Sequence, residues 1–476
     1  MARTLTETGP HLLSTGRLRG RRRTDPTGRV AAVARPLLLV AAAVPFVLGA
    51  APVGEPSPAG PENQMEPKRR YVAPTDAADS ARAHYNEGLA LQASGDLNEA
   101  VVRFHEAIAR DPDFAEAYHA LGLALKAMGH LDAAIEKYRI ALELQPKNVA
   151  IANNLGVALE AKGDYDAAVE AYRSALRLKP DSAMIHYNLA LALKAKGNPD
   201  EAVEEFRETI RLEPDHAAAY NNLGVVLETK GDLDGAVAAY RAALRLVPKG
   251  KRAAAYALNL GGALRAKGDM NGAADACRAA LRLQPDNGEA HYCLGLALLR
   301  TGTLDDAVAE FKEATRLLPE RADAYQHLAL ALEAKGDGDA AVNAYRAAVR
   351  LQPENAAARY GLGVLLQARN DLDGAIAEYR AVLALNPDHP GASNNLGVAL
   401  QEKGDIDGAI TVYLNALNHE QNDPIVYFNL GLALLAKGQS AEAARAFRDY
   451  VRLAPQTPEH RSRIEYAKSK LGEQGR

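Results

Sequence analysis

The residues whose type and spacing most suggest chemistry are asparagines that recur at a regular interval, as Asn154, Asn188 and Asn222 do at 34 residues. An amide side chain offers both hydrogen-bond donors and an acceptor. At a fixed interval such groups could bond the backbone of an extended polypeptide without reading its side chains. The alternative is that they bond neighbouring helix backbone or water, and the sequence leaves both open. The candidate binding residues are Asn86, Asn154, Asn188, Asn222, Asn259, Asn395 and Asn429, hereafter the asparagine row.

Motifs for catalysis, metals or cofactors are missing from the sequence, which has no HExxH, no CxxC and no glycine-rich phosphate loop. His84, His186 and His291 share one place in the interval but recur a whole interval or more apart. We therefore expect them to pack between helices rather than to bind a metal. The sequence predicts no enzyme activity, no cofactor and no metal site.

Charge argues against nucleic acid as a partner. The formal net charge is −4, and arginines concentrate in the first 35 residues, so the rest of the chain is more acidic still. A nucleic-acid-binding domain normally carries a basic stripe.

Two further residue sets have two interpretations each. Five aromatic residues at one place in the interval could stack on a ligand or form half-buried core: Tyr85, Tyr187, Tyr292, Tyr360 and Phe428. Cys277 and Cys293, the only cysteines, stand nine residues before and seven after a turn at Asp286. Equal heights on consecutive antiparallel helices would allow a disulfide in an exported protein. Otherwise they are two independent small core residues.

The elements that position these residues are predicted to be helix pairs, repeated eleven times. Each period contains two apolar-periodic stretches of about 14 residues, which is long enough for a helix. Position one of the successive periods falls at residues 81, 115, 149, 183, 217, 254, 288, 322, 356, 390 and 424. Position twenty holds alanine in every period: Ala100, Ala134, Ala168, Ala202, Ala236, Ala273, Ala307, Ala341, Ala375, Ala409 and Ala443.

The ends of the helices are also marked. A glycine such as Gly163, or Asn370 in one period, allows the left-handed backbone that ends the first helix. Asp164 is placed to cap the second helix, and a recurrent proline such as Pro180 stops it. Extra residues near Lys251 and Arg252 are expected to lengthen the following helix by one turn.

Residues 117–148, AYHALGLALKAMGHLDAAIEKYRIALELQPKN, resemble the tetratricopeptide repeat family in their Leu-Gly, Ala, aromatic and Pro signature. The resemblance covers residues 81–457. It implies an all-α, right-handed α-solenoid superhelix of about eleven helix-turn-helix repeats, with the first helices lining a concave groove. The asparagine row is similar to the asparagine ladder in the repeats of O-linked N-acetylglucosamine transferase, whose catalytic domain has no counterpart here.

The family resemblance implies a binding module. We expect a protein–protein interaction scaffold that binds an extended peptide or partner protein in the groove. The alternative is a structural or self-assembling spacer of a cell-envelope complex. Some family members grip a C-terminal carboxylate with clustered Lys and Arg, but the matching positions here hold Leu, Val, Ala and Asn. The oligomeric state is left open.

The N-terminal region is predicted to be a targeting segment. Arginines, among them Arg17 and Arg35, precede a run without charge from Pro36 to Val53, which ends in small residues. This pattern is typical of a secretory signal peptide, and an uncleaved membrane anchor is the alternative. Either one would place the repeats outside the cytoplasm, in the periplasm or anchored to the membrane. Initiation at Met65 would instead give a cytoplasmic protein.

These expectations divide the chain into four parts. Residues 1–51 form the signal peptide or anchor, and residues 52–80 form a disordered linker rich in Pro and Gly. Residues 81–457 form the repeats. Residues 458–476 form a C-terminal capping helix and tail, since the sequence Thr457-Pro458-Glu459 favours a helix start.

Overall fold

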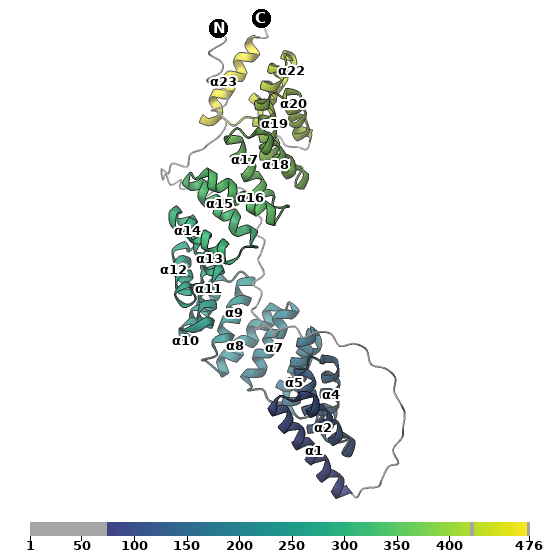
Figure 1. Ribbon diagram of the computed structural model, residues 1–476. Helices are drawn as coiled ribbons and strands as arrows, with labels where there is room; N and C mark the ends of the chain where they lie inside the picture. The colour runs from purple at the N-terminus through teal and green to yellow at the C-terminus, as the bar shows by residue number, and fades with distance from the viewer. Residues whose placement is uncertain (1–73, 419–422, 474–476) are drawn as a thin grey trace, which may run out of the picture. The chain divides into compact units, whose positions relative to one another are not determined.

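The computed structural model describes residues 74–418 and 423–473, and this part of the chain folds into 23 α-helices. Figure 1 shows them following one another in chain order. Their bounds are α1 (Pro74–Ser94), α2 (Leu97–Arg110), α3 (Ala115–Ala127), α4 (Leu131–Leu144), α5 (Val149–Lys162), α6 (Tyr165–Leu178), α7 (Ala183–Lys196), α8 (Pro199–Leu212), α9 (Ala217–Thr229), α10 (Leu233–Leu246), α11 (Gly250–Lys267), α12 (Met270–Leu283), α13 (Gly288–Thr301), α14 (Leu304–Leu317), α15 (Ala322–Lys335), α16 (Gly338–Leu351), α17 (Ala356–Ala368), α18 (Leu372–Leu385), α19 (Pro390–Lys403), α20 (Ile406–Asn418), α21 (Pro424–Ala436), α22 (Ser440–Leu453) and α23 (Pro458–Glu473).

The helices form eleven pairs, which we number as repeats 1 to 11 from α1–α2 to α21–α22. Each helix packs against the next along the chain, and α23 packs on α22 after the last pair. First helices of adjacent repeats, such as α3 and α5 or α19 and α21, also contact one another. The predicted all-α solenoid of about eleven repeats with a terminal helix is therefore confirmed.

Each repeat uses the predicted signals at the turn between its two helices. Gly163 ends α5 with a φ of 86°, and Asn370 takes the equivalent place with a φ of 64°. Asn370 is the one non-glycine residue with positive φ in the described ranges. Asp164 then accepts a hydrogen bond from the backbone N–H of Ala167 and starts α6. Because stop and start recur in the same places, successive second helices begin in the same register.

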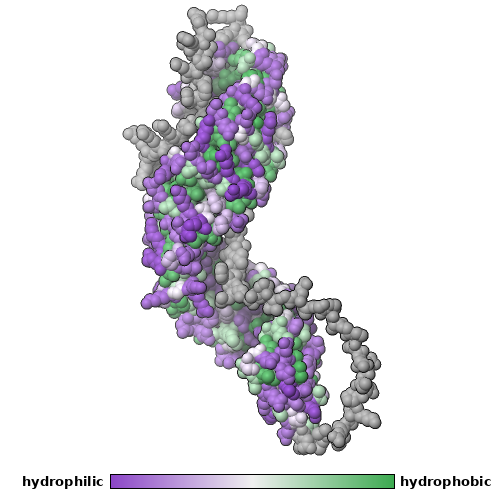
Figure 2. Space-filling model, in the orientation of Figure 1, coloured by the Kyte–Doolittle hydropathy of each residue, from purple (hydrophilic) through white to green (hydrophobic). Residues whose placement is uncertain are grey.

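A seam of small residues joins the two helices of each repeat. All eleven alanines at position twenty are fully buried. Gly156 of α5 lies so close to the Tyr172 ring of α6 that a methyl group there would sit 2.6 Å from a ring carbon. The core is therefore made of small residues and rings between helices, in one large cluster and three smaller ones among the described residues. The visible surface is largely hydrophilic, with hydrophobic residues in patches between (Figure 2).

A row of ion pairs joins most adjacent repeats at their edges. In each, a cation at the end of a first helix meets an aspartate at the start of the second helix one repeat earlier. The pairs are Lys162–Asp132, Lys196–Asp166, Lys230–Asp200, Lys267–Asp234, Lys335–Asp305, Arg369–Asp339, Lys403–Asp373 and Lys437–Asp407. Two junctions lack the pair. There the aspartate position holds Asn98 or Asn271, and the cation position holds Met128 or Thr301.

The middle of the array departs from strict periodicity in two ways. Helix α11 has 18 residues where the first helices on either side have 13 or 14, which confirms the predicted extra turn. Cys277 of α12 and Cys293 of α13 form a disulfide, with Cα atoms 6.2 Å apart. The disulfide links repeats 6 and 7. The sequence left two interpretations of these cysteines open, and the structure shows the disulfide.

The ends of the array extend the repeats by single helices or turns. Helix α1 begins at Pro74, so residues 74–80 of the predicted linker belong to the first helix. Helix α23 packs through Tyr466, whose ring centroid lies 6.0 Å from that of Phe428. No helix within 74–418 and 423–473 is both long and apolar enough to cross a bilayer. The predicted targeting segment and most of the linker lie outside the described residues.

Candidate binding face

The asparagine row lies on the first helices, and these occupy the more closely packed side of the stack. First helices of adjacent repeats contact one another directly, as α3 and α5 do, whereas second helices pack mainly on first helices. The residues of the row therefore lie on the side of the stack where first helices of adjacent repeats meet.

The side-chain amides of the row connect consecutive repeats. Each one from repeat 3 onward donates a hydrogen bond to position five of the preceding repeat's first helix. The pairs are Asn154 to His119 Nε2 (2.8 Å), Asn188 to Asn153 Oδ1 (3.1 Å), Asn222 to the Tyr187 hydroxyl (3.0 Å), Asn259 to Asn221 Oδ1 (2.9 Å), Asn395 to the Tyr360 hydroxyl (3.1 Å) and Asn429 to Asn394 Oδ1 (2.7 Å). Asn86, in repeat 1, is exposed.

These bonds use the amide nitrogens and leave several amide oxygens unused. Asn222 Oδ1 accepts from Lys194 Nζ at 3.1 Å, and Asn395 Oδ1 accepts from the neighbouring Asn394. The oxygens of Asn154, Asn188 and Asn259 have no donor among the described residues. Asn429 is only 2 % exposed, so it belongs to the interior. The row thus presents acceptors, mainly in repeats 3 to 6, rather than seven equivalent amides.

The interruption of the row in repeats 7 to 9 is filled by other interactions. Cys293 takes position six in repeat 7 and is in the disulfide. His327 takes it in repeat 8, where its Nδ1 lies 3.2 Å from the Tyr292 hydroxyl. Arg321 lies 4.0 Å from the centre of the Tyr292 ring and pairs with Asp323 at 2.7 Å. Burial lowers the pKa of His327. At Asp323 burial raises the pKa of the carboxyl group, but the hydrogen bond and the charge of Arg321 outweigh burial, so that pKa is lowered.

The five aromatic residues of the first helices pack into the core. Each ring lies against an aromatic ring 19 residues later on the second helix, with centroids 5.9 to 6.1 Å apart. Tyr292 and Phe428 are buried, and the others are half-buried. This arrangement supports the core interpretation over stacking on a ligand.

The histidines also serve packing. His186 Nδ1 lies 2.6 Å from Glu205 Oε2 in its own repeat, and its Nε2 lies 2.8 Å from the Pro180 carbonyl. His291 repeats both contacts with Glu310 and Pro285. No group of three potential metal ligands occurs in the described part of the chain.

A second periodic polar pair was not anticipated from the sequence. The tyrosine hydroxyl of the second helix donates to position twelve of the first helix, as Tyr172 does to Glu160 at 2.9 Å. The same bond joins Tyr240 to Glu228, Tyr345 to Glu333, Tyr379 to Gln367 and Tyr413 to Gln401. The signal that could have revealed it is a Glu or Gln twelve residues before a Tyr. Tyr138 is the exception, because its buried hydroxyl has no partner.

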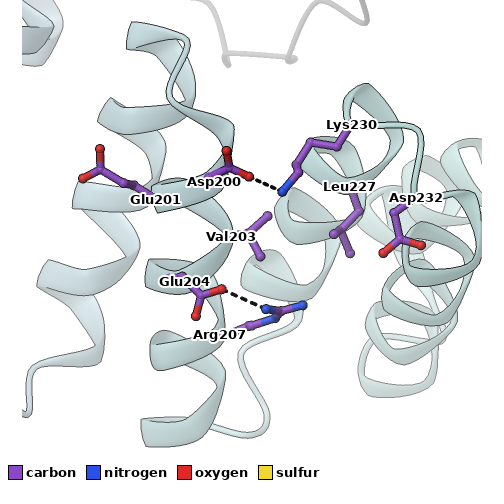
Figure 3. Close-up of a pocket in the computed structure, with 8 residues that line it drawn as sticks. All are labelled: Asp200, Glu201, Val203, Glu204, Arg207, Leu227, Lys230 and Asp232. Atoms are coloured by element: carbon purple, nitrogen blue, oxygen red, sulfur yellow. Dashed lines mark hydrogen bonds and ion pairs between the residues drawn. The ribbon is translucent and has the colours of Figure 1, made fainter.

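The pocket in Figure 3 lies at the junction of repeats 4 and 5, away from the asparagine row. Its volume is about 370 Å³, and it is lined by Asp200, Glu201, Val203, Glu204, Arg207, Leu227, Lys230 and Asp232. Two of its acids already pair with its cations, Asp200 with Lys230 and Glu204 with Arg207 (Figure 3). These pairs belong to the packing between and within repeats, so the pocket offers few free polar groups.

Comparison with known proteins identifies the repeat. A model of the tetratricopeptide repeat matches residues 119–183, 187–251, 249–288, 258–322 and 327–390, which together span more than half of the chain. Further models of the same repeat match residues 88–129, 401–438 and 425–457. No protein of curated function matches significantly.

The chain is similar to several solved structures. The MamA protein is 26% identical over 35% of this chain and 92% of its own, with a TM-score of 0.34. YrrB, described as a TPR protein with an unusual peptide-binding site, is 23% identical over 42% of this chain and 99% of its own, with a TM-score of 0.36. The C-terminal part of a TPR repeat-containing protein from Cytophaga hutchinsonii is 19% identical over 51% of this chain and 98% of its own, with a TM-score of 0.44.

Proposed function

The chain belongs to the tetratricopeptide repeat family, whose repeats build protein-interaction scaffolds, and we propose that it holds an extended segment of a partner protein along its first-helix face. The observation that carries this proposal is the row of unused amide oxygens on Asn154, Asn188 and Asn259. An acceptor row complements the backbone N–H groups of a guest chain, and backbone groups are the same for any guest sequence.

The spacing of the row suits an extended guest. Packed helices lie about 10 Å apart, and an extended chain advances about 3.3 Å per residue. Acceptors in adjacent repeats, such as Asn154 and Asn188, would therefore meet roughly every third residue of the guest. The inter-repeat bonds fix the amide orientation before the guest arrives, so less conformational entropy is lost on binding.

Apolar side chains beside the row supply the rest of the surface. Val157, Leu191 and Val225 stand three positions after an asparagine of the row and are half-buried. Leu330 continues this line in repeat 8 and is 38% exposed. A guest that covers these side chains removes apolar area from water, which favours binding without requiring a particular sequence.

The test measures retention of the full chain on an array of immobilised short peptides with capped ends. Changing Asn154, Asn188, Asn222 and Asn259 together to alanine is expected to lower retention at least about tenfold, since several hydrogen bonds are lost. Because the same change removes inter-repeat bonds, thermal unfolding of each variant is followed in parallel. Changing Asn153 and Asn221 to alanine is the matched control, as it breaks two inter-repeat bonds but keeps the row.

Two results would contradict the proposal. Equal retention of the wild type and the folded fourfold variant would remove the asparagine row from the binding site. Retention on no peptide, together with a discrete oligomer in light scattering, would favour a self-assembling spacer instead.

A further inference from the structure

In five of the six repeats with a tyrosine at position 24, position twelve holds a hydrogen-bond acceptor. Where position 24 is tyrosine, position twelve is Glu or Gln in repeats 3, 5, 8, 9 and 10, and the hydroxyl donates to it at 2.7 to 3.1 Å. Where position 24 is Phe206 or Phe311, position twelve is Lys194 or Leu299, whereas repeat 1 combines Phe104 with Gln92. The array thus provides an acceptor where a hydroxyl needs one.

Repeat 2 breaks this relation. Tyr138 of α4 is fully buried, and its hydroxyl has no hydrogen-bond partner. Position twelve of the same repeat holds Lys126, a donor, where the five other tyrosine repeats hold an acceptor. A buried polar group without a partner is costly and rare in folded proteins. Such departures from an otherwise consistent pattern occur preferentially at functional sites.

The other polar groups around Tyr138 are also donors. Lys126 is half-buried on the first-helix face and has no ion-pair partner among the described residues. The His119 ring lies 5.8 Å from the Tyr138 ring, and its Nε2 accepts from Asn154. A neutral imidazole that accepts at Nε2 carries its proton at Nδ1, and that N–H has no acceptor among the described residues.

Two acids of repeats 2 and 3 already accept hydrogen bonds from other residues. Glu116, on the same helix, accepts from Gln145 Nε2 at 2.8 Å. Glu160, one repeat further, accepts from Tyr172. Repeat 2 therefore places an ammonium group and a hydroxyl, neither with an acceptor among the described residues, near an imidazole on which the Glu116 charge acts.

We propose that repeat 2 binds the side-chain carboxylate of an aspartate or glutamate of the guest chain, with Lys126 as counter-charge and the Tyr138 hydroxyl as hydrogen-bond donor. This proposal rests on the proposed function, because the guest must lie along the first-helix face to deliver the acid. The face continues through repeats on both sides of repeat 2, so a guest passing along it presents a side chain there rather than its end.

The occupant must displace neighbouring side chains, because the hydroxyl is fully buried in the unbound protein. A carboxylate accepts several hydrogen bonds at once, and bonds to a charged acceptor are stronger than neutral ones. The site differs from a clamp of clustered bases, because it uses one cation and one buried hydroxyl.

The test compares labelled peptides by fluorescence anisotropy with the full chain. One peptide of Ser, Asn, Val and Gly has capped ends and a single central Glu, the second has Gln instead, and the third has Gln and a free C-terminal carboxylate. The wild type is expected to bind the Glu peptide about tenfold tighter than the Gln peptide, as one charge-assisted bond provides. Lys126→Gln and Tyr138→Phe are each expected to bring this ratio close to one.

A second readout separates binding from folding. Lys126→Gln provides the acceptor that Gln367 and Gln401 provide elsewhere, so its melting temperature should rise while selectivity for the acid falls. Tyr345→Phe removes a hydroxyl that already has its acceptor, Glu333, and should leave the ratio unchanged. Lys179→Gln makes the same charge change at an exposed turn and should also leave it unchanged.

The outcomes distinguish the two proposals. Equal wild-type affinity for the Glu and Gln peptides overturns the acid site and leaves the proposed function standing. If the peptide with the free C-terminal carboxylate binds most tightly, the acid site is overturned, because the protein then recognises a chain end rather than an acidic side chain. Binding of none of the three peptides overturns both proposals.

Discussion

At the residue scale, the fold depends on where a methyl group fits and where it does not. Position eight of the first helix is glycine in most repeats because a ring of the second helix lies against it, as Tyr172 does against Gly156. Ala190 and Ala329 occupy the same position in repeats 4 and 8, so the backbones there accommodate one more carbon. The next position along the helix is different, because a methyl group on Gly262 would meet nothing within 4 Å.

Two glycine-to-alanine changes should therefore have opposite effects. Gly156→Ala forces a methyl group against a buried ring and should lower the free energy of unfolding by about 1–3 kcal/mol. Gly262→Ala relieves the entropic cost of a helical glycine and should raise that free energy by about 0.5–1 kcal/mol. Urea unfolding followed by circular dichroism measures both. A stabilising Gly156→Ala would show that the Tyr172 ring moves freely, against the packing described here.

At the element scale, the seam, which joins the two helices of one repeat, and the edge ion pairs, which join adjacent repeats, contribute very differently to stability. The seam buries its alanines completely. The aspartates of the edge pairs stay exposed, as the Asp200 side chain does at 85 %. Exposed ion pairs contribute little because water and salt screen them. The edge pairs therefore contribute little to the junction between repeats, while the buried seam strongly stabilises the helix pair of each repeat.

Removal of one edge pair should confirm this ranking. Asp200→Ala is expected to lower the free energy of unfolding by less than about 1 kcal/mol, and the loss should shrink further in high salt. The reciprocal change, Asn271→Asp with Thr301→Lys, builds the pair at a junction that lacks it and should produce a gain of similar size. If Asp200→Ala lowered the free energy of unfolding as much as Gly156→Ala does, the edge pairs would matter as much as the seam and this ranking would be wrong.

At the scale of the whole array, each repeat contacts only its neighbours, so stability is a sum of repeats and interfaces. The last repeat depends on α23, which brings Tyr466 against Phe428 and Phe447. The hydroxyl of the buried Tyr450 also lies 3.1 Å from His460 Nδ1 of α23. Without α23 these rings of repeat 11 would face water.

Deletion of residues 458–476 should therefore have a local effect. Hydrogen exchange is expected to become faster in α21 and α22 and to stay unchanged in the first repeats, because nearest-neighbour coupling decays along the array. Deletion of residues 474–476 alone is the control and should change neither region. Faster exchange along the entire chain would indicate one cooperative unit instead of a series of coupled repeats.

The sequence predicted the features that depend on contacts within a single repeat. Helix ends, the alanine seam, the Asn370 turn and the lengthened α11 depend on residues close along the chain, and all were found. Contacts between repeats were harder to predict from the sequence, because they depend on how one first helix is rotated against the next. The partners of the asparagine row, 35 residues earlier in most repeats, are such a case. The unpartnered Tyr138 hydroxyl could not be predicted without knowing that position twelve reaches it.

The interruption of the asparagine row has one more consequence. A guest lying on a strictly periodic surface could shift by one repeat and meet the same groups, so many alignments would have nearly equal energy. Here four consecutive members, Asn154 to Asn259, are followed by three repeats without asparagine at that position. If the proposed guest binds there, a segment long enough to contact four amides has a single best alignment. The uneven distribution of asparagines would therefore disfavour shifts of the guest by one repeat along the first-helix face.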